Sequence, residues 1–336
     1  MVRPDLNLAG VGPAWRTVRT LPYAFGLRSF VAPKLLWSKG IGDYCDFAGT
    51  RAYRLAPTEV TQPDSFFAEH YRAAHGLIWL RLGTIPRDVD KFVRVALPQI
   101  KEPFILITTD GDASVPSGLR ADTVTALKAS PYLVAWYSQN CDGTDAVVRP
   151  FPIGLDFHTL RNWTTPQRLA ASLERLRRVA APVRMRPRRL FSDLNLSPTP
   201  ARREAIAALQ GCDHFDQAKA RLAQTAIWRQ YARYPLVLSA EGNGIDCHRT
   251  WELLLLGCIV VTKTSSLDVL YEGLPVAIVE DWREARDRAR LCSWIERLAH
   301  LTDAEYIRDR LDPEYWTGAL RAQLAGAARC GARNPD

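Results

Sequence analysis

Residues 235–261 read "PLVLSAEGNGIDCHRTWELLLLGCIVV". This stretch begins with a short apolar run, turns through a loop with two glycines, starts a helix between Asp246 and Arg249, and ends in a second apolar run. Short, branched apolar runs that alternate with helices are typical of buried parallel strands. The stretch therefore predicts a strand, a loop, a helix and a further strand of an α/β fold.

The same alternation occurs in both halves of the chain. Apolar runs that end in Gly or Asp lie at 76–83 ("GLIWLRLG") and 102–112 ("EPFILITTDGD"), and a second series begins at 188–196 ("RRLFSDLNL"). A segment rich in Pro and Arg separates the two series. We therefore expect a first domain over 1–157 and a second over 158–310. The helical tail over 311–336 is a candidate to pack back on the first domain.

Composition and charge restrict the class of protein. Hydrophobic residues at 47% and charged residues at 24% indicate a soluble globular chain, and the longest apolar stretch, Leu253 to Val261, is too short to span a bilayer. The seven cysteines show no paired spacing, which favours reduced thiols and a cytoplasmic location. The net charge of +8 predicts an anionic partner. Arginines and aromatic residues do not recur in a nucleic-acid-binding pattern, so we expect no nucleic acid.

The loop and helix start at 239–252 carry the chemistry of a phosphate site. Gly242 and Gly244 permit close backbone approach, and the helix start offers unpaired N–H groups. Arg249 could grip a diphosphate in two places, and Glu252, three residues later, could accept hydrogen bonds from ribose hydroxyls. The other candidate ligand-binding residues of this segment are Asn243, Asp246 and His248. A lone histidine near a helix start is more often structural.

Further candidates follow neighbouring strands. Lys263, Ser265 and Ser266 lie between a strand and the next helix, where they could bind phosphate or sugar hydroxyls. A serine that simply caps the helix would give the same pattern. Asn195 follows the first strand of the second half, where a residue lining the ligand site is expected.

Asp110 and Asp112 are the candidate catalytic residues. They end an apolar strand of the first half, and one of them could remove the proton from an acceptor hydroxyl. Two alternatives stay open, namely an ordinary polar strand exit and an Asp-x-Asp cation site. Asp156 and His158 are further candidate bases near the junction of the two domains.

Residues 242–282, "GNGIDCHRTWELLLLGCIVVTKTSSLDVLYEGLPVAIVEDW", resemble the nucleotide-sugar region of exostosin-like glycosyltransferases. These enzymes have an arginine, a glutamate three residues on, then "GC" and a strand. The resemblance covers roughly residues 188–285, and extends more loosely to "YSQN" and "PFPIGLD". It implies a GT-B fold, in which two Rossmann-like domains face each other across a cleft. It also implies that Arg249 and Glu252 bind the donor, and that no metal is needed.

The resemblance implies a glycosyltransferase that transfers a hexose or pentose from a nucleotide diphosphate sugar. The expected acceptor is a glycan, a lipopolysaccharide or a lipid-linked saccharide, with the donor as substrate and no separate cofactor. The positive charge adds peripheral contact with an anionic membrane face as an expectation. Two alternatives remain: a metal-dependent transferase that uses Asp110 and Asp112, and a non-catalytic nucleotide- or glycan-binding protein. The loop "AEGNGIDCH" is richer in polar groups than the usual exostosin sequence, so we expect it to set sugar specificity.

Overall fold

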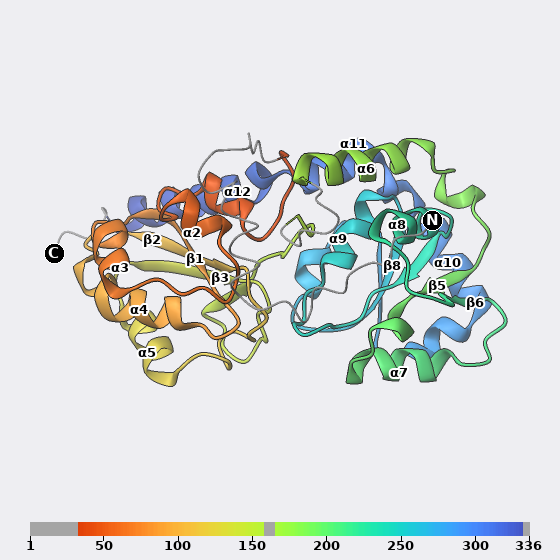
Figure 1. Ribbon diagram of the computed structural model, residues 1–336, viewed down its shortest axis with the longest axis horizontal. Helices are drawn as coiled ribbons and strands as arrows, with labels where there is room; N and C mark the ends of the chain where they lie inside the picture. Colours follow the sequence, from red (N-terminus) through yellow and green to blue (C-terminus); the bar gives the residue numbers. More distant parts are fainter. Residues whose placement is uncertain (1–32, 158–164, 332–336) are drawn as a thin grey trace, which may run out of the picture.

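The computed structural model describes residues 33–157 and 165–331, which form two α/β units side by side (Figure 1). Each unit has its own parallel sheet, and helices cover both sheets. No described helix is long and apolar enough to cross a membrane.

The first unit has four parallel strands in the order β1-β2-β3-β4. Its strands are β1 (Gly76–Arg81), β2 (Phe104–Thr109), β3 (Leu133–Ser138) and β4 (Val148–Pro150). Its helices are α2 (Arg51–Leu55), α3 (Asp64–Tyr71), α4 (Arg87–Val95) and α5 (Ala121–Ala129). Every residue of β1 and β2 is buried, as expected for continuous apolar runs covered on both faces.

The second unit has five parallel strands in the order β6-β5-β7-β8-β9. They are β5 (Leu190–Ser192), β6 (Phe215–Gln217), β7 (Leu236–Leu238), β8 (Ile259–Lys263) and β9 (Val276–Val279). The helices are α6 (Pro166–Val179), α7 (Pro200–Leu209), α8 (Gln224–Tyr231), α9 (His248–Leu255), α10 (Arg288–Leu298) and α11 (Ala304–Arg310). The strand order reverses at β5, which makes this a doubly wound sheet with a switch point between β5 and β7.

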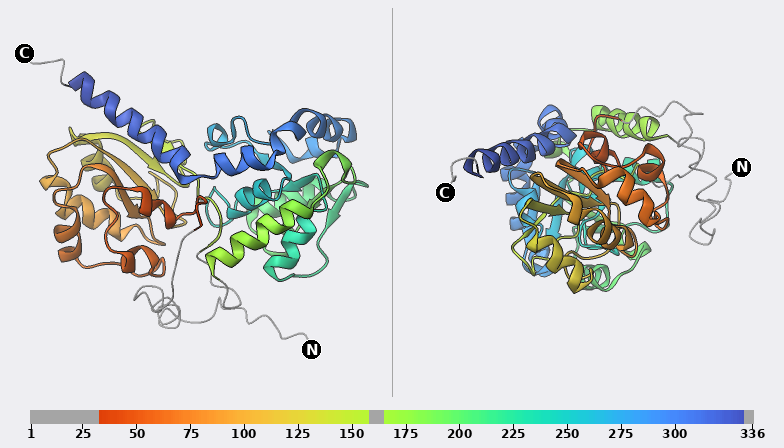
Figure 2. Two further views of the ribbon diagram at one scale, coloured as in Figure 1. Left: turned by 90° about the horizontal axis from the view of Figure 1, so that it is seen from above. Right: turned by 90° about the vertical axis from the view of Figure 1, so that its left-hand side faces the viewer.

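Helix α12 (Pro313–Gly331) returns to the first unit and lies along its sheet (Figure 2). Arg321 pairs with Asp46 at 2.9 Å, and the Tyr137 hydroxyl donates to Gln323 Oε1 at 2.8 Å. The Trp316 ring contacts both Phe151 of the first unit and Trp251 of the second. The tail therefore ties the two units together.

The carboxyl edges of the two sheets face each other. Asp246 N donates to Asn140 Oδ1 at 3.0 Å, and Ser266 Oγ donates to the Cys141 carbonyl at 2.5 Å. In each pair, one residue follows a strand of the first sheet and the other follows a strand of the second. The prediction of an α/β fold with two facing Rossmann-like units, the GT-B arrangement, is confirmed.

Some elements differ from the sequence predictions. Strand β6 was not predicted, and a helix expected around 217–231 is confined to α8 (Gln224–Tyr231). The helix expected after Ser266 is a short 3-10 helix over Asp268–Tyr271. Neither helix difference changes the sheet order that positions the site.

Candidate functional site

The topology places a ligand crevice in the second unit. In open α/β sheets, ligands bind outside the carboxyl ends of the strands at the point where the strand order reverses. Here that point lies between β5, which Asp193 and Asn195 follow, and β7, which the loop over 239–247 follows. The four described strands of the first sheet run in chain order without such a reversal. The crevice of the second unit is therefore the favoured site.

Arg249 lies at this crevice in a partly buried ion pair. Its Nε is 3.2 Å from Asp193 Oδ1, and the same nitrogen donates to the Tyr231 hydroxyl at 3.2 Å. The side chains of Arg249 and Asp193 are 14% and 17% exposed, so part of each reaches solvent. The switch point thus brings a residue that follows β5 against one in the first turn of α9.

Arg202 supplies a second cation at the same place. It lies in the first turn of α7, where the Thr199 hydroxyl caps the helix by accepting from Arg202 N at 3.3 Å. A Cβ at Gly242 would lie 3.0 Å from Arg202 Nη2, so the glycine lets the guanidinium approach the loop. Arg202 Nη2 also lies 3.9 Å from Cys247 Sγ, at the start of α9.

The charges of both arginines act at the start of α9. Burial raises the pKa of the Cys247 thiol, and the positive charges of Arg249 and Arg202 oppose this rise. Cys247 is the N-cap residue of α9 and its side chain makes no capping hydrogen bond. The start of this helix therefore combines its own partial positive charge with two guanidinium groups.

Glu252 is held by helix α8. Its Oε2 accepts from Trp228 Nε1 at 2.8 Å and its Oε1 accepts from Gln224 Nε2 at 3.4 Å. The residue is 8% exposed, so these contacts fix the carboxylate on the buried side of α9. Each carboxylate oxygen can accept a further hydrogen bond.

Some of the buried polar atoms without partners belong to residues next to the crevice. Among the described residues, Asn195 Oδ1, Arg202 Nε and Gln224 Oε1 are buried and have no hydrogen-bond partner. Folded proteins rarely leave such atoms unpaired, because each costs about 1–3 kcal/mol. A polar ligand in the crevice is a physical reason for this group of atoms.

The second half of the glycine loop contacts the first unit. A Cβ at Gly244 would lie 2.6 Å from the Asn140 side-chain amide, so this glycine is required by the close approach of the two units. His248 Nδ1 lies 2.7 Å from the Gly154 carbonyl. Asn243 Nδ2 donates to Asp112 Oδ2 at 3.4 Å. The loop therefore serves as part of the interface as well as one wall of the crevice.

Asp246 is a buried acidic group of this interface and is 4% exposed. Its carboxylate accepts from Ile153 N at 2.7 Å, from Cys247 N at 2.8 Å and from Trp251 Nε1 at 3.0 Å. Burial raises the pKa of Asp246 to about 6, against the lowering effect of these hydrogen bonds. The hydrogen bond from Ile153 connects the start of α9 to the segment that follows β4.

The candidates after β8 lie near the surface or at the interface. Lys263 Nζ pairs with Glu204 Oε1 at 2.6 Å, and its side chain is 41% exposed. Ser265 Oγ accepts from Leu267 N at 3.2 Å, which is a local turn contact. Ser266 contacts Cys141 as described above. Neither serine caps the short helix that follows, because its N-cap residue is Leu267 and no side chain caps it; the two serines make a turn contact and an interface contact instead.

Asp110 and Asp112 have different surroundings. Asp110 is 3% exposed, and its Oδ2 lies 3.1 Å from Lys39 Nζ and 3.2 Å from Arg81 Nε. Its φ of 63° is a left-handed conformation, and Asn140, after the next strand, shares it with a φ of 54°. Asp112 is exposed and contacts the glycine loop. In the described part of the chain no three His, Cys, Asp or Glu residues are grouped as metal ligands.

The remaining candidate bases add little to the site. Asp156 is 7% exposed and lies in the crossing segment between the units. His158 lies outside the described residues.

Sequence reasoning missed four charged residues, namely Lys39, Arg81, Asp193 and Arg202. Asp193 and Arg202 carry a usable signal, because they flank the first strand-to-helix turn of the second unit, where the motif "TPARR" starts a helix. Their contacts with Arg249 and Cys247 depend on strand order, which local patterns do not give.

Fold and contacts together define a two-unit α/β protein in which Arg202 and Arg249 lie next to the switch point of the second sheet. No family model and no curated protein matches the chain. Solved structures with a distant likeness in fold include two trehalose-phosphate synthases, of which the first is UDP-forming. The alpha,alpha-trehalose-phosphate synthase of Burkholderia vietnamiensis has a TM-score of 0.40 at 11% identity, over 76% of this chain and 75% of that chain. The alpha,alpha-trehalose 6-phosphate synthase of Burkholderia multivorans has a TM-score of 0.41 at 14% identity, over 78% and 73%.

Proposed function

We propose that the chain is a glycosyltransferase that moves a sugar from a nucleotide diphosphate sugar to a hydroxyl of a saccharide acceptor. The observation that carries this proposal is the crevice of the second unit, where Arg202 and Arg249 converge on the start of α9. Guanidinium groups match the oxygens of a diphosphate in geometry and charge. Glu252, one turn further along α9, offers a fixed carboxylate to ribose hydroxyls. The sequence resemblance to exostosin-like enzymes supports the same roles for Arg249 and Glu252.

Transfer without a metal ion is part of the proposal. As the bond between the sugar and the diphosphate breaks, negative charge develops on the leaving diphosphate. Arg202, Arg249 and the first N–H groups of α9 would stabilise this charge in place of a cation. Asp193 pairs with Arg249 before the donor binds, and the diphosphate would then share that guanidinium.

We assign the general base to Asp112 in preference to Asp110. Asp110 is buried between two cations, whereas Asp112 is exposed and accepts a hydrogen bond from Asn243 of the glycine loop. In a direct displacement, Asp112 would take the proton of the acceptor hydroxyl. The oxygen of that hydroxyl would attack the anomeric carbon of the donor sugar at the same time. The nucleoside diphosphate then leaves with the bonding electrons.

Turnover tests the proposal. We expect the protein to release nucleoside diphosphate from one member of a donor panel in the presence of saccharide acceptors and excess chelator. Asp112→Asn should reduce the rate about 100-fold or more, because it removes the base. Release that requires a divalent ion would support the metal-dependent alternative. Donor binding without release would support a non-catalytic binding protein.

The acceptor class and the place of action follow from charge. The net charge of +8 supports an anionic acceptor, such as a glycan, a lipopolysaccharide or a lipid-linked saccharide, and contact with an anionic membrane face. Cosedimentation with vesicles that contain or lack anionic lipid tests the membrane contact. Equal recovery of the protein with both kinds of vesicle would contradict contact with an anionic membrane face.

A further inference from the structure

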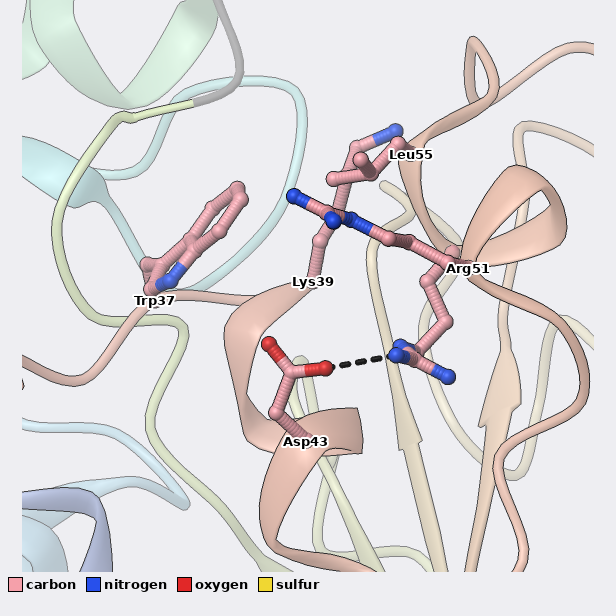
Figure 3. Close-up of a pocket in the computed structure, with 6 residues that line it drawn as sticks. Trp37, Lys39, Asp43, Arg51 and Leu55 are labelled. Carbon is pink, nitrogen blue, oxygen red and sulfur yellow. Dashed lines mark hydrogen bonds and ion pairs between the residues drawn. The ribbon is translucent and has the colours of Figure 1, made fainter. Parts of the chain in front are cut away.

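The first unit contains a cavity of its own. None of the residues that line it belongs to the crevice of the second unit. Its volume is about 330 Å³, at the small end of the range for small-molecule sites. Figure 3 shows its walls, with Trp37 on one side and basic side chains on the other. The lining residues are Trp37, Lys39, Asp43, Arg51, Arg54 and Leu55.

The lining is electropositive. Three cations and one carboxylate line the cavity, and one of the cations, Lys39, pairs with Asp110 behind the wall. Asp43 Oδ1 pairs with Arg54 Nη2 at 2.6 Å, and Arg54 Nη1 donates to the Gly49 carbonyl at 3.1 Å, so this guanidinium is fixed in the wall. Trp37 and Leu55 provide apolar surface beside the charges. A ligand that combines an anionic group with an apolar surface matches these walls.

The charged residues behind the cavity also favour an anionic ligand. Lys39 and Arg81 are 5% and 1% exposed, and both pair with the single carboxylate of Asp110. Burial lowers the pKa of Lys39, and Asp110 acts against this effect. The charge of exposed Glu59 also acts to raise the pKa of Lys39. Two buried cations on one carboxylate are costly, and an anion beside Lys39 would offset part of that cost.

The cavity is connected to the helix that carries the donor site. Trp37 forms an antiparallel bridge with Gly154, and the Gly154 carbonyl lies 2.7 Å from Nδ1 of His248. His248 is the first residue of α9, which also carries Arg249 and Glu252. Figure 3 shows Trp37 on the side of the cavity nearest the second unit. A molecule bound in the cavity would thus lie on the side of the first unit that faces the donor helix.

We propose that this cavity binds the oxyanion group of a negatively charged saccharide, a sugar phosphate or a uronic acid, and so positions it as the acceptor. Arg51, Arg54 and Lys39 would hold the oxyanion, and Trp37 would contact the sugar ring. The acceptor role rests on the function proposed above, whereas binding of the anion does not.

Calorimetric titration of the full chain at low ionic strength tests this inference. The probes are inorganic phosphate, glucose 6-phosphate, glucuronate and uncharged glucose. We expect the charged sugars to bind at least about 10-fold more tightly than glucose. The order of glucose 6-phosphate and glucuronate distinguishes a phosphate from a carboxylate. Arg51→Gln should weaken binding of the charged sugars about 5-fold or more, and Arg72→Gln, which removes an exposed charge on α3, should leave it unchanged.

Separate titration with nucleoside diphosphates keeps the two proposals distinguishable. Arg51→Gln should retain wild-type affinity for the nucleotide, because the cavity and the crevice share no lining residue. Glucose that binds as tightly as the charged sugars would overturn the inference, and so would charged sugars that Arg51→Gln binds like the wild type. Binding of charged sugars without any nucleotide binding would leave the anion site intact and contradict the glycosyltransferase proposal.

Discussion

Glu252 is the residue whose contacts most limit how its role can be tested. Its carboxylate is the hydrogen-bond acceptor for buried Trp228 Nε1. Glu252→Ala would leave that donor unpaired and should lower the free energy of unfolding by about 1–3 kcal/mol. Loss of nucleotide binding in this variant alone would therefore be ambiguous.

Glu252→Gln separates binding from stability. The glutamine carbonyl can still accept from Trp228, whereas the charge is lost. We expect unfolding in urea to change little, and nucleotide affinity to fall about 10-fold, measured by calorimetry. Arg229→Ala, on the exposed part of α8, is the matched control and should alter neither quantity. Wild-type nucleotide affinity in Glu252→Gln would show that Glu252 does not bind the ribose.

A test of Arg249 must also separate binding from stability, because its partner Asp193 is partly buried. Arg249→Ala would leave Asp193 without its cation and should cost about 3 kcal/mol of stability. Arg249→Lys keeps the charge but loses the planar, two-pronged geometry. We expect Arg249→Lys to remain folded by circular dichroism and to bind the nucleoside diphosphate about 10-fold more weakly. An unchanged affinity would show that Arg249 does not contact the diphosphate.

At the scale of elements, the loop between β7 and α9 joins the two units through Asp246. Its folded pKa of about 6 lies above the ordinary value of 3.8, so the folded state holds the proton more tightly than the unfolded state. The stabilisation from this group is therefore complete below about pH 4 and falls as the pH rises to about 6. Above that pH it stays constant.

This linkage predicts a pH-dependent difference between the wild type and Asp246→Ala. The wild type should exceed the variant in stability by a larger margin at about pH 4.5 than at about pH 7.5, by up to about 2 kcal/mol. Urea unfolding at the two pH values measures the margin. A margin that widens toward pH 7.5 would mean that hydrogen bonds to the ionised carboxylate outweigh its burial.

The same loop predicts a steric effect. Gly244→Ala would place a Cβ 2.6 Å from the Asn140 amide and push the units apart, at a cost of about 1–3 kcal/mol. In the matched variant Gly318→Ala, the new Cβ meets no atom within 4 Å in helix α12, so stability should be equal or slightly higher. Thermal unfolding compares the two. Equal melting temperatures would mean that the loop does not need its glycine at this interface.

At the scale of the whole molecule, the sequence predicts the strands better than the site. Runs such as "GLIWLRLG" and "GCIVV" are mostly apolar and give buried strands where expected. Strand β6 was missed because "FDQ" is short and only partly buried, with no apolar pattern. Yet β6 is the strand that makes the sheet reverse its order at β5.

The site residues that the sequence did not predict were missed for the same physical reason. Arg249 and Glu252 follow from local spacing on one helix. Asp193 contacts Arg249 of α9, and Arg202 contacts Cys247 just before α9, because β5 pairs directly with β7. The segment with β6 and α8 separates these two strands in the chain. Lys39 reaches Asp110 from a segment without helical or strand periodicity. Such pairings depend on long-range topology, which one sequence does not encode in any local pattern.

Calorimetric titration with nucleoside diphosphates and their sugar conjugates tests the central claim most directly. We expect one nucleobase to be preferred, and at 100 times its dissociation constant that ligand should stabilise the protein by about 2.7 kcal/mol. Binding should weaken in Arg249→Lys and Glu252→Gln, and should persist in excess chelator. A protein that binds no member of the panel, or that binds one equally well in both variants, would contradict the assignment of the crevice between β5 and β7 as the donor site.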